Sequence, residues 1–327
     1  MRQKIIDSVL KEKLIVIVRG VERENLIPLA EAMYKGGIRL LEITYSADGS
    51  VSDEDTASNI KMLAEHFEGR MFIGAGTVLT TEQVDRAIAA GAQFIVSPGF
   101  NPVVVQYCIE KGIVITPGIS SPSEIEQAIM FGLEVVKFFP AEASGGLAKI
   151  KAMAAPYTAM KFMPTGGINA KNINSYLDCD KILACGGSWM VKDTLINEGK
   201  FDEIEALTKE AVANMLGFKL AHLAINCEDE QKAKAVADMF TLCFNFSQRE
   251  IPVSYFCTEE IEVMKFNGRG TMGHIAVKTN YMDKAVAYLE RKGIALDYES
   301  AQYDEKGNMT FIYIKDEFGG FAVHLCL

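Results

Sequence analysis

The chain has 327 residues, 49% of them hydrophobic, which is enough apolar material for two separate cores. Its formal net charge of -10 argues against nucleic acid or an anionic membrane surface as a partner. The first residues lack the apolar core of a signal peptide, and no later segment offers the uncharged apolar run of a membrane span. The 7 cysteines are scattered without a CxxC pair, so we expect reduced thiols, mostly in the core, in a cytoplasmic protein.

Short apolar runs alternate with amphipathic helical patterns along residues 1–215. This alternation predicts an α/β fold with a parallel sheet, and eight such strand and helix units predict a (β/α)8 TIM barrel. Chemistry in that fold collects where the strands end, so the polar and glycine-rich ends of these runs form one set. The predicted strands are residues 14–19, 39–44, 71–77, 93–98, 113–117, 134–140, 160–164 and 181–187.

The second predicted strand carries a glutamate, Glu42, between two apolar residues. Side chains alternate along a strand, so Glu42 points into the barrel if Leu41 and Ile43 pack against helices. A buried carboxylate needs a partner, and Lys137, on a strand across the barrel, can provide it. The alternative is a purely structural ion pair, but the position of both residues near the catalytic face favours a functional one.

The sixth predicted strand, EVVKFFP, places Lys137 among apolar residues. Burying an ammonium group is costly, so this lysine should have a depressed pKa or lie beside a carboxylate. A neutral amine is the nucleophile that Schiff-base chemistry requires. The alternative is a lysine that lays its stem along apolar surface and keeps its head in water.

The last two predicted strands run into the double-glycine sequences PTGGI and CGGSW. Loops at these two positions of a barrel often build a phosphate site from backbone N–H groups and a short helix N-terminus. Glycine lets the backbone approach phosphate oxygens closely. The two loops together therefore predict a phosphate site that needs no basic residue.

These motifs stand in the order and at the spacing of the KDPG/KHG aldolase family, which residues 1–215 resemble. The motifs are LEIT, GAGTVL, IVSPG, TPGIS, KFFPAEA, PTGGI and GGSW. The resemblance implies a class I lyase that cleaves 2-dehydro-3-deoxy-6-phosphogluconate (KDPG) to pyruvate and glyceraldehyde 3-phosphate. It also implies that the aldolase requires no metal or other cofactor and assembles as a homotrimer.

The resemblance further implies that Lys137 forms the imine and that Glu42 moves protons. Family members often carry an arginine after the strand-two glutamate, where this chain has Ser46, so we assign the substrate carboxylate to Arg19 with Thr77. The full set of implied substrate-binding residues is Arg19, Thr77, Ser97, Pro98, Phe139, Thr165, Gly166, Gly167, Gly186, Gly187 and Ser188.

Two alternatives stay open. An aldolase for 4-hydroxy-2-oxoglutarate or for the galactonate epimer of KDPG would keep the Schiff base and change the substrate; the PAEA sequence and the glycine loops favour a phosphorylated gluconate. A metabolite-binding regulatory protein would have no reason to keep Glu42 and Lys137.

The pattern changes in residues 216–327, where two copies of one unit follow each other. Each begins with a strand, containing HLAI in the first copy and HIAV in the second, followed by a helix. The repeat predicts two βαβββ units side by side, a smaller α+β domain that resembles the vicinal oxygen chelate, or glyoxalase/bleomycin-resistance, superfamily. The later strands are predicted at residues 253–256, 260–266, 298–303, 309–314 and 320–325.

Metal-using members of that superfamily take a ligand from the first strand and the last strand of each unit. By resemblance, His222, Glu262 and His274 match three of the positions, which implies a possible divalent metal site. The fourth position falls on Val323, or on His324 after a shift of one residue, and such a shift turns a side chain to the other face. The alternatives are half-buried structural histidines, or a dimerisation or ligand module without metal.

Overall fold

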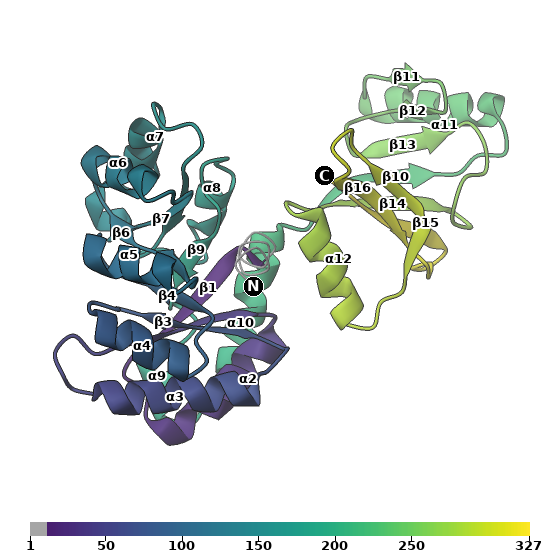
Figure 1. The fold of residues 1–327 in the computed structure, drawn as a ribbon. Helices are drawn as coiled ribbons and strands as arrows, with labels where there is room; N and C mark the ends of the chain where they lie inside the picture. Colours follow the sequence, from purple (N-terminus) through teal and green to yellow (C-terminus); the bar gives the residue numbers. More distant parts are fainter. Residues whose placement is uncertain (1–11) are drawn as a thin grey trace. The chain divides into compact units, whose positions relative to one another are not determined.

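The computed structural model describes residues 12–327, and the chain divides into two compact units between Met215 and Leu216 (Figure 1). Each unit has its own sheet system and its own core. Within the described residues, no helix combines the length and the apolar character needed to span a bilayer. The seven cysteines are unpaired, and five of them are buried, as expected.

The first unit is a ring of parallel strands. One sheet has the order β5-β4-β3-β2-β1-β9, a second has the order β6-β7-β8, and two bridges, Phe162 to Ile182 and Thr165 to Gly186, join β8 to the segment of β9. The fifth predicted strand, residues 113–117, corresponds to β5, and a further short strand, β6, begins after Pro117, which has no N–H to donate. The strands are β1 (Leu14–Val18), β2 (Leu40–Thr44), β3 (Phe72–Gly76), β4 (Phe94–Val96), β5 (Val114–Thr116), β6 (Gly118–Ile119), β7 (Val135–Phe138), β8 (Lys161–Pro164) and β9 (Cys185–Gly187).

Helices follow the strands in the first unit, so the prediction of eight parallel strand and helix units is confirmed. Several helices begin where the sequence supplies a cap: Ser52, Thr80 and Asn101 each accept a hydrogen bond from a backbone N–H of the first turn. The helices are α2 (Arg23–Gly36), α3 (Asp53–His66), α4 (Thr81–Ala89), α5 (Pro102–Glu110), α6 (Pro122–Met130), α7 (Gly146–Ala154), α8 (Ile173–Leu177), α9 (Asp193–Asn197) and α10 (Phe201–Leu216), with the 3-10 helix η1 (Glu142–Ser144).

The second unit is one mixed sheet of order β11-β12-β13-β10-β14-β17-β16-β15. Each half runs as one strand, one helix and three strands, and the halves meet where β10 and β14 pair antiparallel. Strand β11 was not predicted, because its sequence Arg-Glu-Ile shows no apolar alternation. The elements are β10 (Lys219–Ile225), α11 (Glu230–Phe244), β11 (Arg249–Ile251), β12 (Ser254–Phe256), β13 (Ile261–Met264), β14 (Gly273–Lys278), α12 (Met282–Arg291), β15 (Leu296–Tyr303), β16 (Met309–Ile314) and β17 (Phe321–Cys326).

Helix α11 covers one face of the first half of this sheet. Its Ala233 and Ala237 share a core cluster with Tyr255 of β12 and Val263 of β13. Because side chains alternate along a strand, the neighbouring Phe256 and Glu262 face away from α11. We call this second side of the sheet the open face, and it carries the chemistry described below.

Candidate active site and metal centre

Lys137 and Glu42 form an ion pair inside the barrel. Lys137 Nζ lies 3.7 Å from Glu42 Oε1, and the two side chains are 7% and 2% exposed. Glu42 points inward because Leu40, on the same face of β2, belongs to the interior cluster with Ile15 and Phe94. Glu42 and Lys137, which were expected to be partners inside the barrel, therefore lie together in the structure.

Gly76 at the end of β3 provides the space for the Glu42 carboxylate. A Cβ built on Gly76 would overlap the Glu42 side chain, so any larger residue would displace the carboxylate. Gly76 pairs in register with Thr44, two residues after Glu42. The role of this glycine was not predicted, since its close approach to Glu42 depends on the pairing of two strands.

A cavity of about 420 Å³ opens at the ends of β1, β7, β8 and β9. Phe139 lies on its wall, and its ring centroid is 5.3 Å from Lys137 Nζ, so the cavity adjoins the lysine. Asp193, at the start of α9, also lines it and was not expected. The predicted site residues in this lining are Arg19, Phe139, Thr165, Gly166, Gly167, Gly187 and Ser188.

The cavity wall has features of a ligand cradle. Thr165 Oγ1 is buried and has no hydrogen-bond partner among the described residues, so its hydroxyl group is available to a ligand. Gly166 and Gly167 have φ values of 98° and 84°, a region that side-chain-bearing residues rarely adopt. Gly186 stands where a Cβ would overlap Thr165 Oγ1, so it makes room for that hydroxyl.

Arg19 borders this cavity and a second one of about 240 Å³, which Ser46, Asp48 and Thr77 also line. Thr77 has a φ of 55°, which is rare for a β-branched residue and is typical of functional sites. The Ser46 hydroxyl group donates to Asp48, so the residue at the expected arginine position is engaged within its own loop. Arg19 is therefore placed to meet an anion in either cavity.

Besides Gly186, two predicted substrate-binding residues, Ser97 and Pro98, do not belong to the lining of these two cavities. Ser97 is 2% exposed, and its hydroxyl group donates to the Gly99 carbonyl oxygen at 2.8 Å. The Pro98 carbonyl lies against Gly118, where a Cβ would overlap it. In the structure these residues shape the loop after β4.

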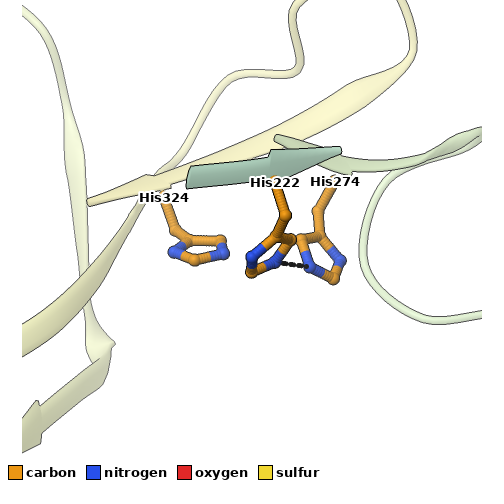
Figure 2. Close-up of side chains that lie close together, drawn as sticks. All are labelled: His222, His274 and His324. Atoms are coloured by element: carbon orange, nitrogen blue, oxygen red, sulfur yellow. Dashed lines mark hydrogen bonds between the residues drawn. The ribbon is translucent and has the colours of Figure 1, made fainter. Parts of the chain in front are cut away.

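Four side chains converge on the open face of the second unit. The Nε2 atoms of His222 on β10 and His274 on β14 are 3.1 Å apart, and Glu262 Oε2 of β13 lies 3.2 and 3.3 Å from them. His324 on β17 completes the group, because one ring nitrogen of each histidine lies within 4.8 Å of the others. Figure 2 shows the three imidazole rings side by side beneath their strands.

The strand register decides between Val323 and His324. Ala224, two residues after His222, pairs with Glu262, and Ala276, two residues after His274, pairs with His324. Glu262 and His324 therefore hold equivalent positions in the two halves. Val323 pairs with Ile275 and faces the other side of the sheet.

The environment favours the neutral forms of His222 and His324 and the charged form of Glu262. Burial, assisted by His274, lowers the pKa of His324 to about 4, and burial also lowers the pKa of His222. Burial alone would raise the pKa of Glu262, but hydrogen bonds with His274 and with Ser254 Oγ, at 2.5 Å, lower it. Neutral imidazole and ionised carboxylate are the forms that bind a metal.

The spacing of the donor atoms fits a transition metal. Ligands about 2.0 to 2.2 Å from one ion are separated by about 2.8 to 3.6 Å, depending on the coordination geometry. The separations of 3.1 to 3.3 Å among His222, His274 and Glu262 fall within this range. Aromatic rings that sequence reasoning missed flank the group, since Phe256 lies 5.7 Å from His222, and Phe311 and Tyr313 lie 4.3 and 5.0 Å from His324, between ring centroids.

Comparison with known proteins gives relatives for the first unit. The model of the family described as KDPG and KHG aldolase matches residues 5–207. A 2-dehydro-3-deoxy-phosphogluconate aldolase of Treponema pallidum is 46% identical over 208 residues, which are 64% of this chain and 96% of the relative. An enzyme of the same name from Haemophilus influenzae is 41% identical over 210 residues, again 64% of this chain and 96% of the relative.

Solved structures show the same likeness. The KDPG aldolase from Legionella pneumophila, with pyruvate captured as a covalent carbinolamine intermediate, has a TM-score of 0.59 and 34% identity, covering 63% of this chain and 97% of that one. The corresponding aldolase of Zymomonas mobilis with 3-phosphoglycerate has a TM-score of 0.57 and 33% identity, covering 63% and 94%. The family match ends at residue 207, before the second unit begins.

Proposed function

The chain belongs to the KDPG and KHG aldolase family and is an aldolase, a lyase, and we propose that its first unit cleaves KDPG to pyruvate and glyceraldehyde 3-phosphate. The observation that carries this proposal is the buried Lys137 and Glu42 pair, 3.7 Å apart and adjoining a cavity with a glycine-rich wall. Release of pyruvate from KDPG, and its loss in Lys137→Met, tests the proposal.

Two residues carry out the reaction: Lys137 is the nucleophile, and Glu42 transfers protons. Lys137 Nζ attacks the C2 keto group, and loss of water from the carbinolamine gives a protonated imine. Glu42 takes the proton of the C4 hydroxyl group as the C3–C4 bond breaks, and the bonding electrons move into the imine to form an enamine. Glu42 then returns a proton to C3, and hydrolysis frees pyruvate and the Lys137 amine.

The ends of the substrate are anionic and need different partners. We assign the phosphate to Thr165, to the backbone of Gly166 and Gly167, and to Gly187 with Ser188, because these residues line one wall of the larger cavity. Arg19 with Thr77 holds the carboxylate, since no other cationic side chain lines either cavity within the described residues. This cradle favours phosphorylated KDPG over 4-hydroxy-2-oxoglutarate.

An apolar patch on the first unit supports an oligomeric assembly. We propose a homotrimer that buries the patch formed by Phe100, Val103, Met130 and Phe131: the two phenylalanine rings are 5.8 Å apart, and Val103 and Met130 are 66% and 85% exposed. Light scattering should give three times the chain mass of 35.9 kDa, and Met130→Glu should reduce it. A monomeric wild type would exclude the trimer.

For the second unit we propose a vicinal oxygen chelate domain that binds one divalent transition metal through His222, Glu262, His274 and His324. The spacing of the donors and the lowered pKa values of His222, His324 and Glu262 support this assignment. Three imidazoles and one carboxylate suit iron, cobalt, nickel or zinc better than calcium or magnesium. The ion would supply Lewis-acid chemistry, and Ser254 would hold the Glu262 carboxylate in place.

A further inference from the structure

We propose that Arg249 is the anion-recognition residue of the second unit, and that the ligand taken at the metal centre carries a carboxylate or phosphate group. This inference rests on the proposed metal site, defined by His222, Glu262, His274 and His324. It adds a substrate class to that site, which the four metal ligands do not specify.

One aromatic ring, that of Phe256, lies between Arg249 and the metal centre. Arg249, Phe256 and Glu262 are direct cross-strand partners on β11, β12 and β13, so all three lie on the open face. The Arg249 guanidinium lies 4.6 Å from the centroid of the Phe256 ring, which is itself 5.7 Å from the ring of His222. This stacking holds the guanidinium against the ring that flanks His222 and leaves its N–H groups free to donate in the plane of the group.

The second half of the sheet provides an internal comparison. Its equivalent row is Asp297, Tyr313 and His324, so Asp297 occupies the position that Arg249 holds in the first half. Arg269 lies over the Tyr313 ring at 4.6 Å and forms a salt bridge with Asp297. Each half therefore places an arginine on an aromatic ring next to the cluster, but only the second half supplies a carboxylate for it.

Arg249 forms no ion pair with an acidic side chain within residues 12–327. Its neighbour Glu250 points to the other side of the strand and pairs with Lys265. An arginine held in place without a carboxylate partner is suited to bind an external one, because its planar fork matches carboxylate and phosphate oxygens.

Further positive charge lies on the same face. Lys219 and Lys278 are direct partners across β10 and β14, an arrangement of like charges that is unfavourable without an anion nearby. Neither forms an ion pair within the described part of the chain, and Lys278 lies on the same face of β14 as His274. This face thus attracts anions although the whole chain carries a formal charge of -10.

The test uses full-length protein loaded with Co²⁺, whose visible absorption reports only on the metal centre. Oxalate and inorganic phosphate are titrated as separate probes for the two anion classes, and imidazole serves as a neutral metal ligand. The variants are Arg249→Met, Arg249→Lys and, as the matched control, Arg269→Met. Bound Co²⁺ per chain and melting temperature are measured for each variant.

We expect Arg249→Met to bind oxalate or phosphate about ten- to hundredfold more weakly, as for loss of a charge-assisted hydrogen bond. Imidazole affinity should be unchanged, Arg249→Lys should recover part of the loss, and Arg269→Met should resemble wild type. The probe that responds identifies the anion class. Equal affinities of wild type and Arg249→Met for both anions, with Co²⁺ bound, would overturn the inference alone, whereas failure of wild type to bind Co²⁺ would overturn the metal site and with it the inference.

Discussion

The carboxylate of Glu42 occupies the space that Gly76 leaves by having no side chain. Gly76→Ala should therefore displace Glu42 from Lys137 while leaving the lysine in place. Because positioned acid–base groups contribute about 10² to 10⁴ in rate, we expect kcat for KDPG cleavage to fall by at least about 10². Borohydride should still trap pyruvate on Lys137.

Gly99→Ala is the matched control, because a Cβ at Gly99 would meet no atom within 4 Å. It should keep wild-type kcat and KM. An active Gly76→Ala variant would show that the carboxylate can move without loss of catalysis, and would remove Glu42 from the role of proton carrier.

The hydroxyl group of Thr165 should contribute to substrate binding but not to the stability of the protein. Its buried Oγ1 has no partner among the described residues, so Thr165→Val removes an unsatisfied hydroxyl group and should not lower the melting temperature. The KM for KDPG should rise about five- to thirtyfold through loss of one hydrogen bond to phosphate. Trapping of pyruvate, which has no phosphate, should be unaffected. A lower melting temperature with unchanged KM would assign this hydroxyl group to the fold.

Arg19 is tested in the direction of synthesis. Arg19→Ala should raise the KM for pyruvate about tenfold or more, since a charge-assisted hydrogen bond to its carboxylate is lost. Arg23→Ala is the control, because Arg23 binds Ser58 and Asn59 on helix α3 and lines neither of the two cavities. If the KM for pyruvate were the same in Arg19→Ala and Arg23→Ala, Arg19 would not be the residue that binds the substrate carboxylate.

If His324 is a metal ligand and His66 is not, substitution of each should affect metal affinity differently. His324→Ala should lower the affinity for Co²⁺ or Zn²⁺ by about 10² or more, whereas His66→Ala, which lies in the first unit and pairs with Glu31, should bind as wild type does. Free metal at a hundredfold excess over its Kd should add about 2.7 kcal/mol to the stability of the second unit. Elemental analysis and thermal melts with and without EDTA measure both effects. Substoichiometric metal in untagged wild type would leave these histidines structural.

Local sequence was sufficient to predict most of the first unit. Its strands could be located because each apolar run is bounded by glycine, proline or charge, and strand alternation predicted that Glu42 faces Lys137. The contact between Gly76 and Glu42 could not be predicted in this way, since it depends on the register between β2 and β3.

In the second unit, local sequence was not sufficient to predict which side chains face the metal cluster. Whether Val323 or His324 faces the cluster depends on the pairing of β17 with β14, about fifty residues earlier in the chain, and a slip of one residue reverses the answer. Strand β11 could not be predicted because it is short and its Arg249 and Glu250 are exposed. The stacking of Arg249 on Phe256 could not be predicted either, since it depends on the pairing of β11 with β12.

The central claim is that Lys137 and Glu42 make the first unit a KDPG aldolase. The most direct measurement is pyruvate release from KDPG by full-length protein, run beside 4-hydroxy-2-oxoglutarate, the galactonate epimer and the Lys137→Met variant. We predict robust turnover of KDPG by wild type, none by Lys137→Met, and borohydride trapping of pyruvate on Lys137 only. Absence of KDPG turnover by folded wild type, or covalent trapping of pyruvate in Lys137→Met, would contradict the account.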